Sequence, residues 1–343
     1  MKELWNYLKT AEKPVFLYGM GNGADKILNE AERRGIKISG VFCSDGFVRD
    51  KTFRGFKLLS YSDVKREYGN VIVLLCFGSS RPEVLQNIKK ISLEQELLAP
   101  DVPVYGNVIF DTDYCRKNRG ALEWVYSRLC DDVSRNTFEC TVKYKITGDP
   151  EFLYRCEVSP NEPYESFLNP TGRESFLDLG AYNGDTVKDF AERFGDYKFI
   201  TAVEPDPKNF RKLSVNTEGF KNIRLINACI SDKCGSKEFS FKKGRGSSSG
   251  GTKTIPALTV DSIATETPVT FIKMDIEGEE LNALKGAERT ILSLSPKMFI
   301  SCYHRSEDII TLPKAVLELR DDYKLYMRHF PGLPAWDTAY YFI

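Results

Sequence analysis

Short apolar runs alternate along the chain with stretches in which apolar residues recur every three or four positions. In the first third, the apolar runs at 14–18, 36–43 and 71–77 predict strands, and a helical pattern follows each of them. The run at 71–77 is apolar throughout, which is typical of a strand buried on both faces of a parallel sheet. This alternation predicts a small Rossmann-like α/β domain over residues 1–112.

Two further segments follow this domain. Residues 113–172 carry apolar side chains at helical spacing and then a polar stretch with four prolines, so we expect a helical connector and a loop. Residues 173–343 return to alternating strands and helices, which predicts a second α/β domain. The first expected strand of this domain ends at Asp178. The other expected strands cover 197–203, 223–227, 237–241, 271–275, 298–303, 323–329 and 338–342. A single helix is expected after the strand at 271–275 and should end near 294.

The second α/β domain opens on the motif Asp178-x-Gly180-x-x-x-Gly184, followed by a helical pattern from Asp185. Strand, tight turn and helix in this order predict a ligand over the carboxyl end of the strand. Dinucleotide folds use Gly-x-Gly-x-x-Gly at this turn, whereas a carboxylate here repels phosphate and suits a cationic ligand. S-adenosylmethionine (SAM) carries an ammonium and a sulfonium and no phosphate, so the motif favours SAM over NAD. An ordinary βα turn without a ligand remains the alternative.

Polar residues also end the next two predicted strands. Glu204 lies about twenty residues beyond Gly184, where an acid can accept both hydroxyls of an adenosine ribose. Asn227 and Ala228 end the third strand, where they would border an adenine edge. Three ligand-compatible strand ends in this order strengthen the prediction of a SAM site.

At this point the carboxyl-terminal half resembles the FkbM-type methyltransferases, a branch of the class I SAM-dependent enzymes. The motifs that carry the resemblance are Phe176-Leu-Asp-Leu-Gly-Ala-Tyr-Asn-Gly-Asp, Val203-Glu-Pro-Asp, Ile226-Asn-Ala-Cys-Ile-Ser-Asp, Leu258-Thr-Val-Asp-Ser-Ile, Phe271-Ile-Lys-Met-Asp-Ile-Glu-Gly-Glu-Glu and Ser301-Cys-Tyr-His304. The resemblance implies a Rossmann-like, seven-stranded sheet and O-methylation, often of sugar or polyketide hydroxyls. The cofactor-binding residues expected from the motifs are Asp178, Gly180, Ala181, Tyr182, Gly184, Thr186, Glu204, Pro205, Asp206, Asn227, Ala228 and Asp275.

Methyl transfer to a hydroxyl requires alignment of the two reactants and removal of the hydroxyl proton. Asp275 and His304 end consecutive strands beside the expected SAM site, and Glu277 lies close to Asp275 in the sequence. His304 has the better unperturbed pKa for a base at neutral pH, and Asp275 is the other candidate. A divalent metal held by Asp275, Glu277 and His304 is chemically possible, but we expect none.

Composition excludes some classes of function. Lys plus Arg and Asp plus Glu both number 48, so no net charge attracts nucleic acid or a membrane surface. No apolar run approaches the roughly 20 residues of a membrane-spanning helix. The nine cysteines are scattered without metal-site spacing, as in reduced proteins of the cytoplasm, which is the expected location.

The sequence therefore predicts a SAM-dependent O-methyltransferase that acts on a hydroxyl of a carbohydrate or related small molecule, with His304 or Asp275 as the base. Its partner would be a sugar-like acceptor, and a homo-oligomer stays open. One alternative is a non-catalytic module that binds SAM or a nucleotide for regulation or assembly. Another is an oxidoreductase that binds a nucleotide at the glycine turn 19–23. The Ser247–Ser249 loop is either a lid or a linker.

Overall fold

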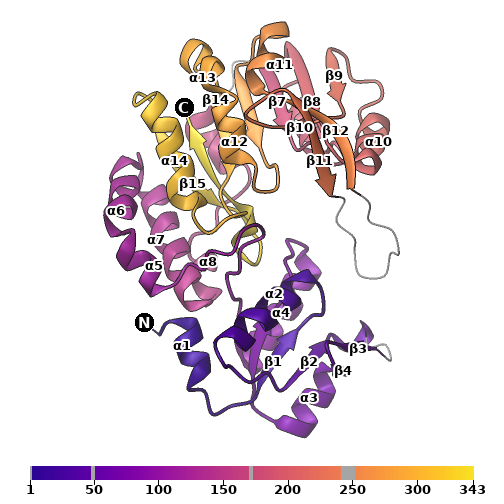
Figure 1. The fold of residues 1–343 in the computed structure, drawn as a ribbon, viewed down its shortest axis with the longest axis vertical. Coiled ribbons are helices and arrows are strands. Elements are labelled where there is room, and N and C mark those ends of the chain that lie inside the picture. Colours follow the sequence, from indigo (N-terminus) through magenta and orange to yellow (C-terminus); the bar gives the residue numbers. More distant parts are fainter. Residues whose placement is uncertain (1, 48–50, 170–172, 241–251) are drawn as a thin grey trace.

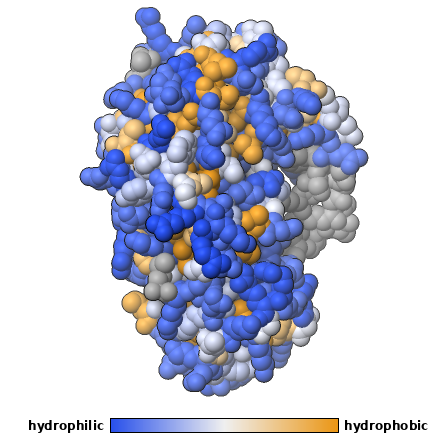
Figure 2. Space-filling model, turned by 60° about the vertical axis from the view of Figure 1, so that its left-hand side comes forward, coloured by the Kyte–Doolittle hydropathy of each residue, from blue (hydrophilic) through white to orange (hydrophobic). Residues whose placement is uncertain are grey.

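The computed structural model describes residues 2–47, 51–169, 173–240 and 252–343. The loop Ser247–Ser249 lies outside these residues. The described residues form two large sheets and a small third one, and helices of the connector lie at the junction between the two large sheets (Figure 1). In the described parts of the chain, no helix has both the length and the apolar character needed to cross a membrane. Hydrophilic residues cover most of the face in Figure 2, and hydrophobic residues gather there in separate patches.

The first sheet has six strands in the order β3-β4-β2-β1-β5-β6, and only the pairing of β3 with β4 is antiparallel. Helix α2 packs on one face of this sheet, and α3 and α4 pack on the other face. The elements are α1 (Leu4–Lys9), β1 (Val15–Tyr18), α2 (Asn22–Arg33), β2 (Gly40–Cys43), β3 (Thr52–Phe53), β4 (Phe56–Ser60), α3 (Tyr61–Tyr68), β5 (Ile72–Leu75), α4 (Pro82–Glu94) and β6 (Glu96–Leu98).

The glycine turn of this first sheet has a packing role. A Cβ atom on Gly23 would collide with the backbone carbonyl of Cys76, so glycine lets the start of α2 lie against the end of β5. Asp45, at the end of the next strand, accepts hydrogen bonds from the backbone and hydroxyl of Ser62 at the start of α3. Close packing and helix capping thus account for these residues without a nucleotide.

The connector is helical, as the sequence predicts, and it is anchored to the second sheet by a buried arginine. Arg328 in β15 is fully buried and pairs with Asp131 at 2.7 Å and with Glu162 at 2.5 Å. Both acids belong to the connector, so their charges offset the buried guanidinium. The connector comprises α5 (Thr112–Lys117), α6 (Arg119–Arg128), α7 (Asp132–Thr147), α8 (Glu151–Tyr154) and a π-type turn (Tyr164–Leu168).

The second sheet has seven strands, which confirms the expectation from the family resemblance. Their order is β15-β16-β14-β13-β7-β8-β9, and only β16 runs antiparallel to its neighbours. The strands are β7 (Ser175–Leu179), β8 (Phe199–Val203), β9 (Ile223–Ile226), β13 (Phe271–Met274), β14 (Lys297–Ser301), β15 (Leu325–His329) and β16 (Thr338–Phe342). The helices are α9 (Asp185–Arg193), α10 (Pro207–Asn216), α11 (Val260–Glu266), α12 (Glu280–Lys285), α13 (Glu288–Leu294) and α14 (Asp308–Leu319).

A small three-stranded sheet lies beside the second sheet. It consists of β10 (Cys229–Ile230), β11 (Gly235–Ser240) and β12 (Thr252–Leu258), with β12 in the middle. The helix expected to end near 294 is two helices, α12 and α13, separated at Gly286 and Ala287. A Cβ atom on Gly286 would collide with the carbonyl oxygen of Ser231, so the break lets the loop after β10 approach. The prediction of one continuous helix was wrong for this reason.

Candidate functional site

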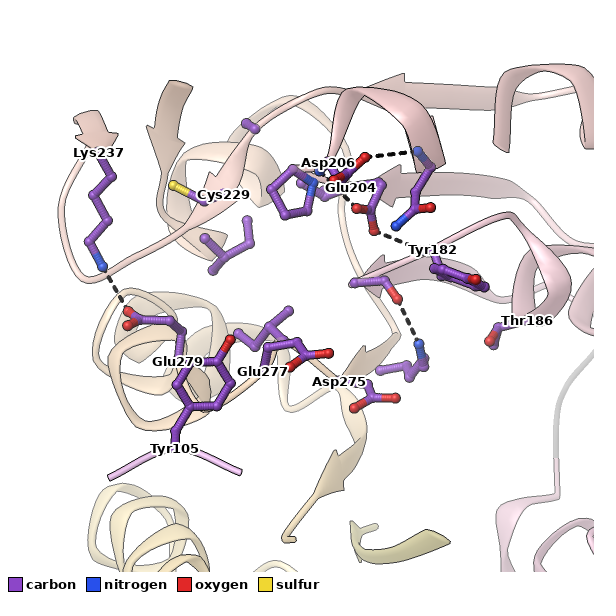
Figure 3. A pocket seen from close by; sticks show the side chains of 18 of the residues that line it. Tyr105, Tyr182, Thr186, Glu204, Asp206, Cys229, Lys237, Asp275, Glu277 and Glu279 are labelled. Atoms are coloured by element: carbon purple, nitrogen blue, oxygen red, sulfur yellow. Dashed lines mark hydrogen bonds and ion pairs between the residues drawn. The ribbon is translucent and has the colours of Figure 1, made fainter. Parts of the chain in front are cut away.

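A cavity of about 610 Å³ lies over the carboxyl ends of β7, β8 and β13, within the usual size range of small-molecule sites (Figure 3). Nine of the residues predicted from the sequence line this cavity. They are Gly180, Tyr182, Thr186, Glu204, Pro205, Asp206, Ala228, Asp275 and Glu277. The parallel strands bring them together although they are nearly a hundred residues apart in the chain.

The turn after β7 is held tightly against β13. Gly180 has a φ of +83°, and a Cβ atom there would collide with the carbonyl oxygen of Asp275. A larger residue at 180 would push the turn away from β13, where Gly180 now lines the cavity. Tyr182 is half-exposed at the rim of the cavity, and its backbone N–H points toward Glu204.

Glu204 has the properties expected of a ribose-binding acid. Its side chain is buried, and its two oxygens accept hydrogen bonds from the backbone N–H groups of Tyr182 at 2.9 Å and Asp206 at 2.8 Å. Each carboxylate oxygen has a second lone pair, so the group can still accept two hydroxyls. Burial raises the pKa of Glu204 to about 7.

Asp178 does not reach the cavity. It is fully buried, and its Oδ1 pairs with Nζ of Lys273 at 3.0 Å. Burial opposes the charged form of Lys273, but the carboxylates of Asp178 and Asp275 together outweigh this effect and raise the pKa of Lys273. The charge that was expected to attract SAM is therefore already neutralised. Lys273 also donates to the carbonyl oxygen of Gly180 at 3.1 Å, so the pair supports the turn.

Three other predicted cofactor residues support the cavity and do not line it. Asn227 donates its amide hydrogens to the backbone carbonyls of Glu204 at 2.8 Å and Pro205 at 3.1 Å. It therefore braces the loop that carries Glu204. Ala181 is buried in the apolar core, and Gly184 packs against α10.

The three candidate catalytic residues occupy different depths. The side chain of Asp275 is 35% exposed and accepts a hydrogen bond from the hydroxyl of Tyr303 at 3.0 Å. Glu277 is exposed at the cavity wall. His304 is only 1% exposed and lies behind Asp275, with its Nε2 atom 3.5 Å from Oδ1 of Asp275.

The ring of His304 is flanked by a second carboxylate. Its Nδ1 atom lies 2.8 Å from Oε1 of the fully buried Glu280. Burial lowers the pKa of His304, but Glu280 and then Asp275 outweigh burial and raise it above its ordinary value. The imidazole is thus held between two carboxylates and lies behind Asp275 rather than in the cavity.

Sequence reasoning missed several residues of the site, among them Lys273, Glu280, Tyr303 and Tyr105. Lys273 lies two residues before Asp275 on the same strand, and period-two spacing could have placed both on one face. No sequence signal points to Tyr105, which comes from the segment between β6 and α5. Its backbone N–H donates to the carbonyl oxygen of His304 at 2.9 Å, and its ring lines the cavity.

The charge of the cavity fits a cationic cofactor. Seven acidic residues line the cavity, as against two lysines. The lysines are paired with acids, Lys273 with Asp178 and Lys237 with Glu279 at 2.7 Å. The surplus of carboxylates favours a ligand with net positive charge, and SAM has one more positive group than its demethylated product.

Comparisons with known proteins agree with this site. A family model described as "Methyltransferase FkbM domain" matches residues 178–324. The crystal structure of methyltransferase FkbM from Methylobacillus flagellatus KT is similar over 96% of this chain and 90% of that chain, with a TM-score of 0.72 and 22% sequence identity. No curated protein matches the chain.

Two other solved structures match about half of the chain. Precorrin-6y C5,15-methyltransferase from Geobacter metallireducens GS-15 is 12% identical over 53% of this chain and 85% of its own, with a TM-score of 0.35. Aeropyrum pernix fibrillarin, in complex with natively bound SAM, is 15% identical over 52% of this chain and 71% of its own, with a TM-score of 0.34. The family match, with the similarity to the FkbM structure from Methylobacillus flagellatus KT, identifies residues 178–324 as a SAM-dependent methyltransferase domain of the FkbM family.

Proposed function

We propose that this enzyme transfers the methyl group of SAM to a hydroxyl of a neutral, polyhydroxylated small molecule such as a carbohydrate. One observation carries the proposal. A single cavity holds a buried carboxylate suited to a ribose diol, Glu204, and a partly exposed carboxylate suited to an acceptor hydroxyl, Asp275 (Figure 3). One side of the cavity can thus hold the cofactor while the other holds the acceptor.

Each residue has a defined task in this reaction. SAM supplies a methyl group on a positively charged sulfur, which leaves as a neutral thioether. Glu204 accepts the two ribose hydroxyls, and the turn at Gly180 leaves room for the methionine part. Asp275 accepts a hydrogen bond from the acceptor hydroxyl and takes up its proton as the new C–O bond forms. The hydroxyl of Tyr303 donates to Oδ1 of Asp275, which leaves Oδ2 for the acceptor.

Asp275 suits the role of base better than His304 does. Only Asp275 lines the cavity, whereas His304 lies behind it and is flanked by Glu280 on its far side. His304 therefore acts through Asp275, whose orientation it helps to fix. Proximity and alignment supply most of the acceleration in such a displacement, so a rigidly held base matters more than a strong one.

The acceptor class follows from the charge and shape of the cavity wall. The surplus of acids repels phosphorylated or carboxylated acceptors, and neither lysine of the wall is unpaired. A sugar offers several hydroxyl donors to carboxylates and an apolar ring face to aromatic side chains. Tyr105 and Tyr303 provide such aromatic surfaces in the cavity.

The test has two stages. Titration calorimetry with SAM and S-adenosylhomocysteine should show binding to the wild type, clearly weakened in Glu204→Gln and unchanged in Glu218→Gln, an exposed acid that does not line the cavity. Production of S-adenosylhomocysteine is then measured with neutral glycosides and with sugar phosphates, in the wild type and in Asp275→Asn. Transfer to neutral glycosides that Asp275→Asn abolishes supports the proposal. Transfer only to phosphorylated acceptors would refute the acceptor class.

A further inference from the structure

We propose that Asp275 and His304 bind a divalent transition-metal ion at the inner wall of the cavity, and that Glu280 holds the histidine ring for this purpose. The proposal concerns a ligand that neither the family match nor the sequence motifs assign. The site itself rests on the geometry of three side chains. Its role in catalysis rests on the proposed function, because the ion would bind the acceptor hydroxyl.

Three side chains that can bind metals converge at this point. One atom from each of Asp275, Glu280 and His304 lies within 4.8 Å of the other two. They come from three elements: the end of β13, the first turn of α12 and the segment after β14. The second sheet is therefore built so that strand ends and a helix start meet here.

The burial of two of these groups needs an explanation. Glu280 is fully buried and His304 is 1% exposed. Among the described residues, Oε2 of Glu280 has no hydrogen-bond partner, and the contact of His304 Nδ1 with Oε1 lacks hydrogen-bond geometry. Buried polar atoms are nearly always satisfied. A cation between the strand ends would compensate the negative charge of both carboxylates.

The contact between His304 and Asp275 has the spacing of two ligands of one ion. Nε2 lies 3.5 Å from Oδ1 of Asp275, which is longer than an ordinary N–H···O hydrogen bond. Ligands that lie about 2.0–2.2 Å from one ion, at tetrahedral or octahedral angles, are about 2.8–3.6 Å apart. The two atoms can thus share an ion with only small movements.

Glu280 completes the arrangement that metal-binding histidines usually have. Coordination through Nε2 would place the ring proton on Nδ1, and a small rotation of the ring would let Oε1 of Glu280, 2.8 Å away, accept it. Oε1 is itself fixed, because it accepts a hydrogen bond from the backbone N–H of Ile276 at 3.0 Å. An imidazole with a carboxylate suits Mn²⁺, Fe²⁺, Co²⁺ or Zn²⁺ better than Mg²⁺ or Ca²⁺.

The ion would change how the acceptor hydroxyl loses its proton. Two protein ligands leave further coordination positions open toward the cavity, where Asp275 is exposed. A hydroxyl oxygen bound there has a lowered pKa. The hydroxyl proton passes to Oδ2 of Asp275, because Oδ1 is the atom that binds the ion. At the same time the hydroxyl oxygen attacks the methyl carbon, and the C–S electron pair goes to sulfur. A weak base then suffices.

The first experiment measures the ion itself, without turnover. Purified protein is treated with a chelator and titrated with Mn²⁺, and free Mn²⁺ is followed by its electron paramagnetic resonance signal. We expect one bound equivalent in the wild type and in the matched control Glu218→Gln, an exposed acid outside the cavity. Asp275→Asn and His304→Gln should each bind Mn²⁺ at least tenfold more weakly, and Glu280→Gln about 10- to 100-fold more weakly.

A second measurement does not depend on the folding of buried variants. Pulsed electron paramagnetic resonance of Mn²⁺ bound to the wild type should show ¹⁴N coupling from one imidazole. Absence of binding, absence of the nitrogen coupling, or equal binding by Asp275→Asn would each overturn the metal site. SAM titrations of the same wild-type samples separate the two proposals. If the protein binds SAM but not Mn²⁺, only the metal site is refuted. If it does not bind SAM, the proposed methyltransferase function is refuted.

Discussion

At the scale of single residues, Glu204 makes cofactor binding depend on pH. Burial raises its pKa to about 7, so near neutral pH a large part of the protein carries it protonated. The ionised form accepts both ribose hydroxyls, and SAM affinity should therefore increase as the pH rises from 6 to 8. In Glu204→Gln this rise should disappear, and binding at pH 8 should weaken by about tenfold or more, as for lost hydrogen bonds to a charged group. Titration calorimetry across this pH range measures both effects.

The raised pKa of Glu204 affects the free energy of unfolding in the opposite direction, so that stability falls as the pH rises. Glu204 has a higher pKa in the folded protein than in the unfolded chain, so the unfolded chain loses its proton first as pH rises. Its contribution to the free energy of unfolding is therefore largest at low pH and falls between about pH 4.5 and 7.

The pH dependence of SAM binding decides the assignment of Glu204. A SAM affinity that falls between pH 6 and 8 in the wild type would contradict it.

Lys273 and Asp178 should behave as one buried unit. Replacing Lys273 by Met leaves a fully buried carboxylate without its cation, which we expect to reduce the free energy of unfolding by about 3–5 kcal/mol. The double variant Asp178→Asn, Lys273→Met removes both charges and should recover most of this loss. Urea unfolding of the two single variants and the double variant forms a complete cycle. Additive losses in the cycle would show that the pair does not interact.

The pairing of these two residues shows what the sequence could not predict about the site. Strand-end position correctly indicated that Glu204 and Asp275 face one cavity. Asp178 was expected to attract the cofactor with its charge. Its partner Lys273, which neutralises that charge, lies 95 residues later in the chain and is not part of the motif. Only the register of β7 with β13, which sets Lys273 opposite Asp178, brings the two together. Local motifs do not contain that register.

At the scale of elements, apolar runs located β1, β2 and β5 of the first sheet and the strands of the seven-stranded sheet, since buried parallel strands have few polar positions. Strands β3, β4, β6 and β12 were missed, and so was α11. The first three are short or lie near the sheet edge, where one face is solvated and the apolar signal is weak. The break between α12 and α13 was missed because its cause is a contact with a distant loop.

That contact predicts the effect of a small substitution. Gly286→Ala should reduce the free energy of unfolding by about 1–3 kcal/mol, because its Cβ would overlap the carbonyl oxygen of Ser231. Gly195→Ala is the matched control, since a Cβ there meets no atom within 4 Å, and its effect should be near zero. Thermal unfolding of both variants decides the point. Equal stability of the two would show that the break between the helices has another cause.

At the scale of the whole molecule, the segment that follows the first sheet reaches into the cavity beside the second sheet. Lys26 on α2 donates to the backbone carbonyls of Pro103 at 2.6 Å and Val104 at 2.5 Å. The next residue, Tyr105, bonds through its backbone to the carbonyl of His304 and packs its ring on Gly278. A helix of the first sheet thus holds the segment that closes one side of the active site.

This connection predicts that damage in the first domain affects the acceptor more than the cofactor. Tyr105 lies beside Glu277 and Glu279 and away from Glu204 (Figure 3). In Tyr105→Ala we therefore expect kcat/KM for the acceptor to fall by about tenfold or more through lost positioning, while SAM affinity stays within about threefold. Lys26→Met should show the same pattern more weakly, because the segment loses an anchor but keeps its ring. Tyr105→Phe retains the ring and should remain close to the wild type. A fall in SAM affinity as large as the fall in kcat/KM would instead place Tyr105 on the cofactor, and the first domain would then serve cofactor binding.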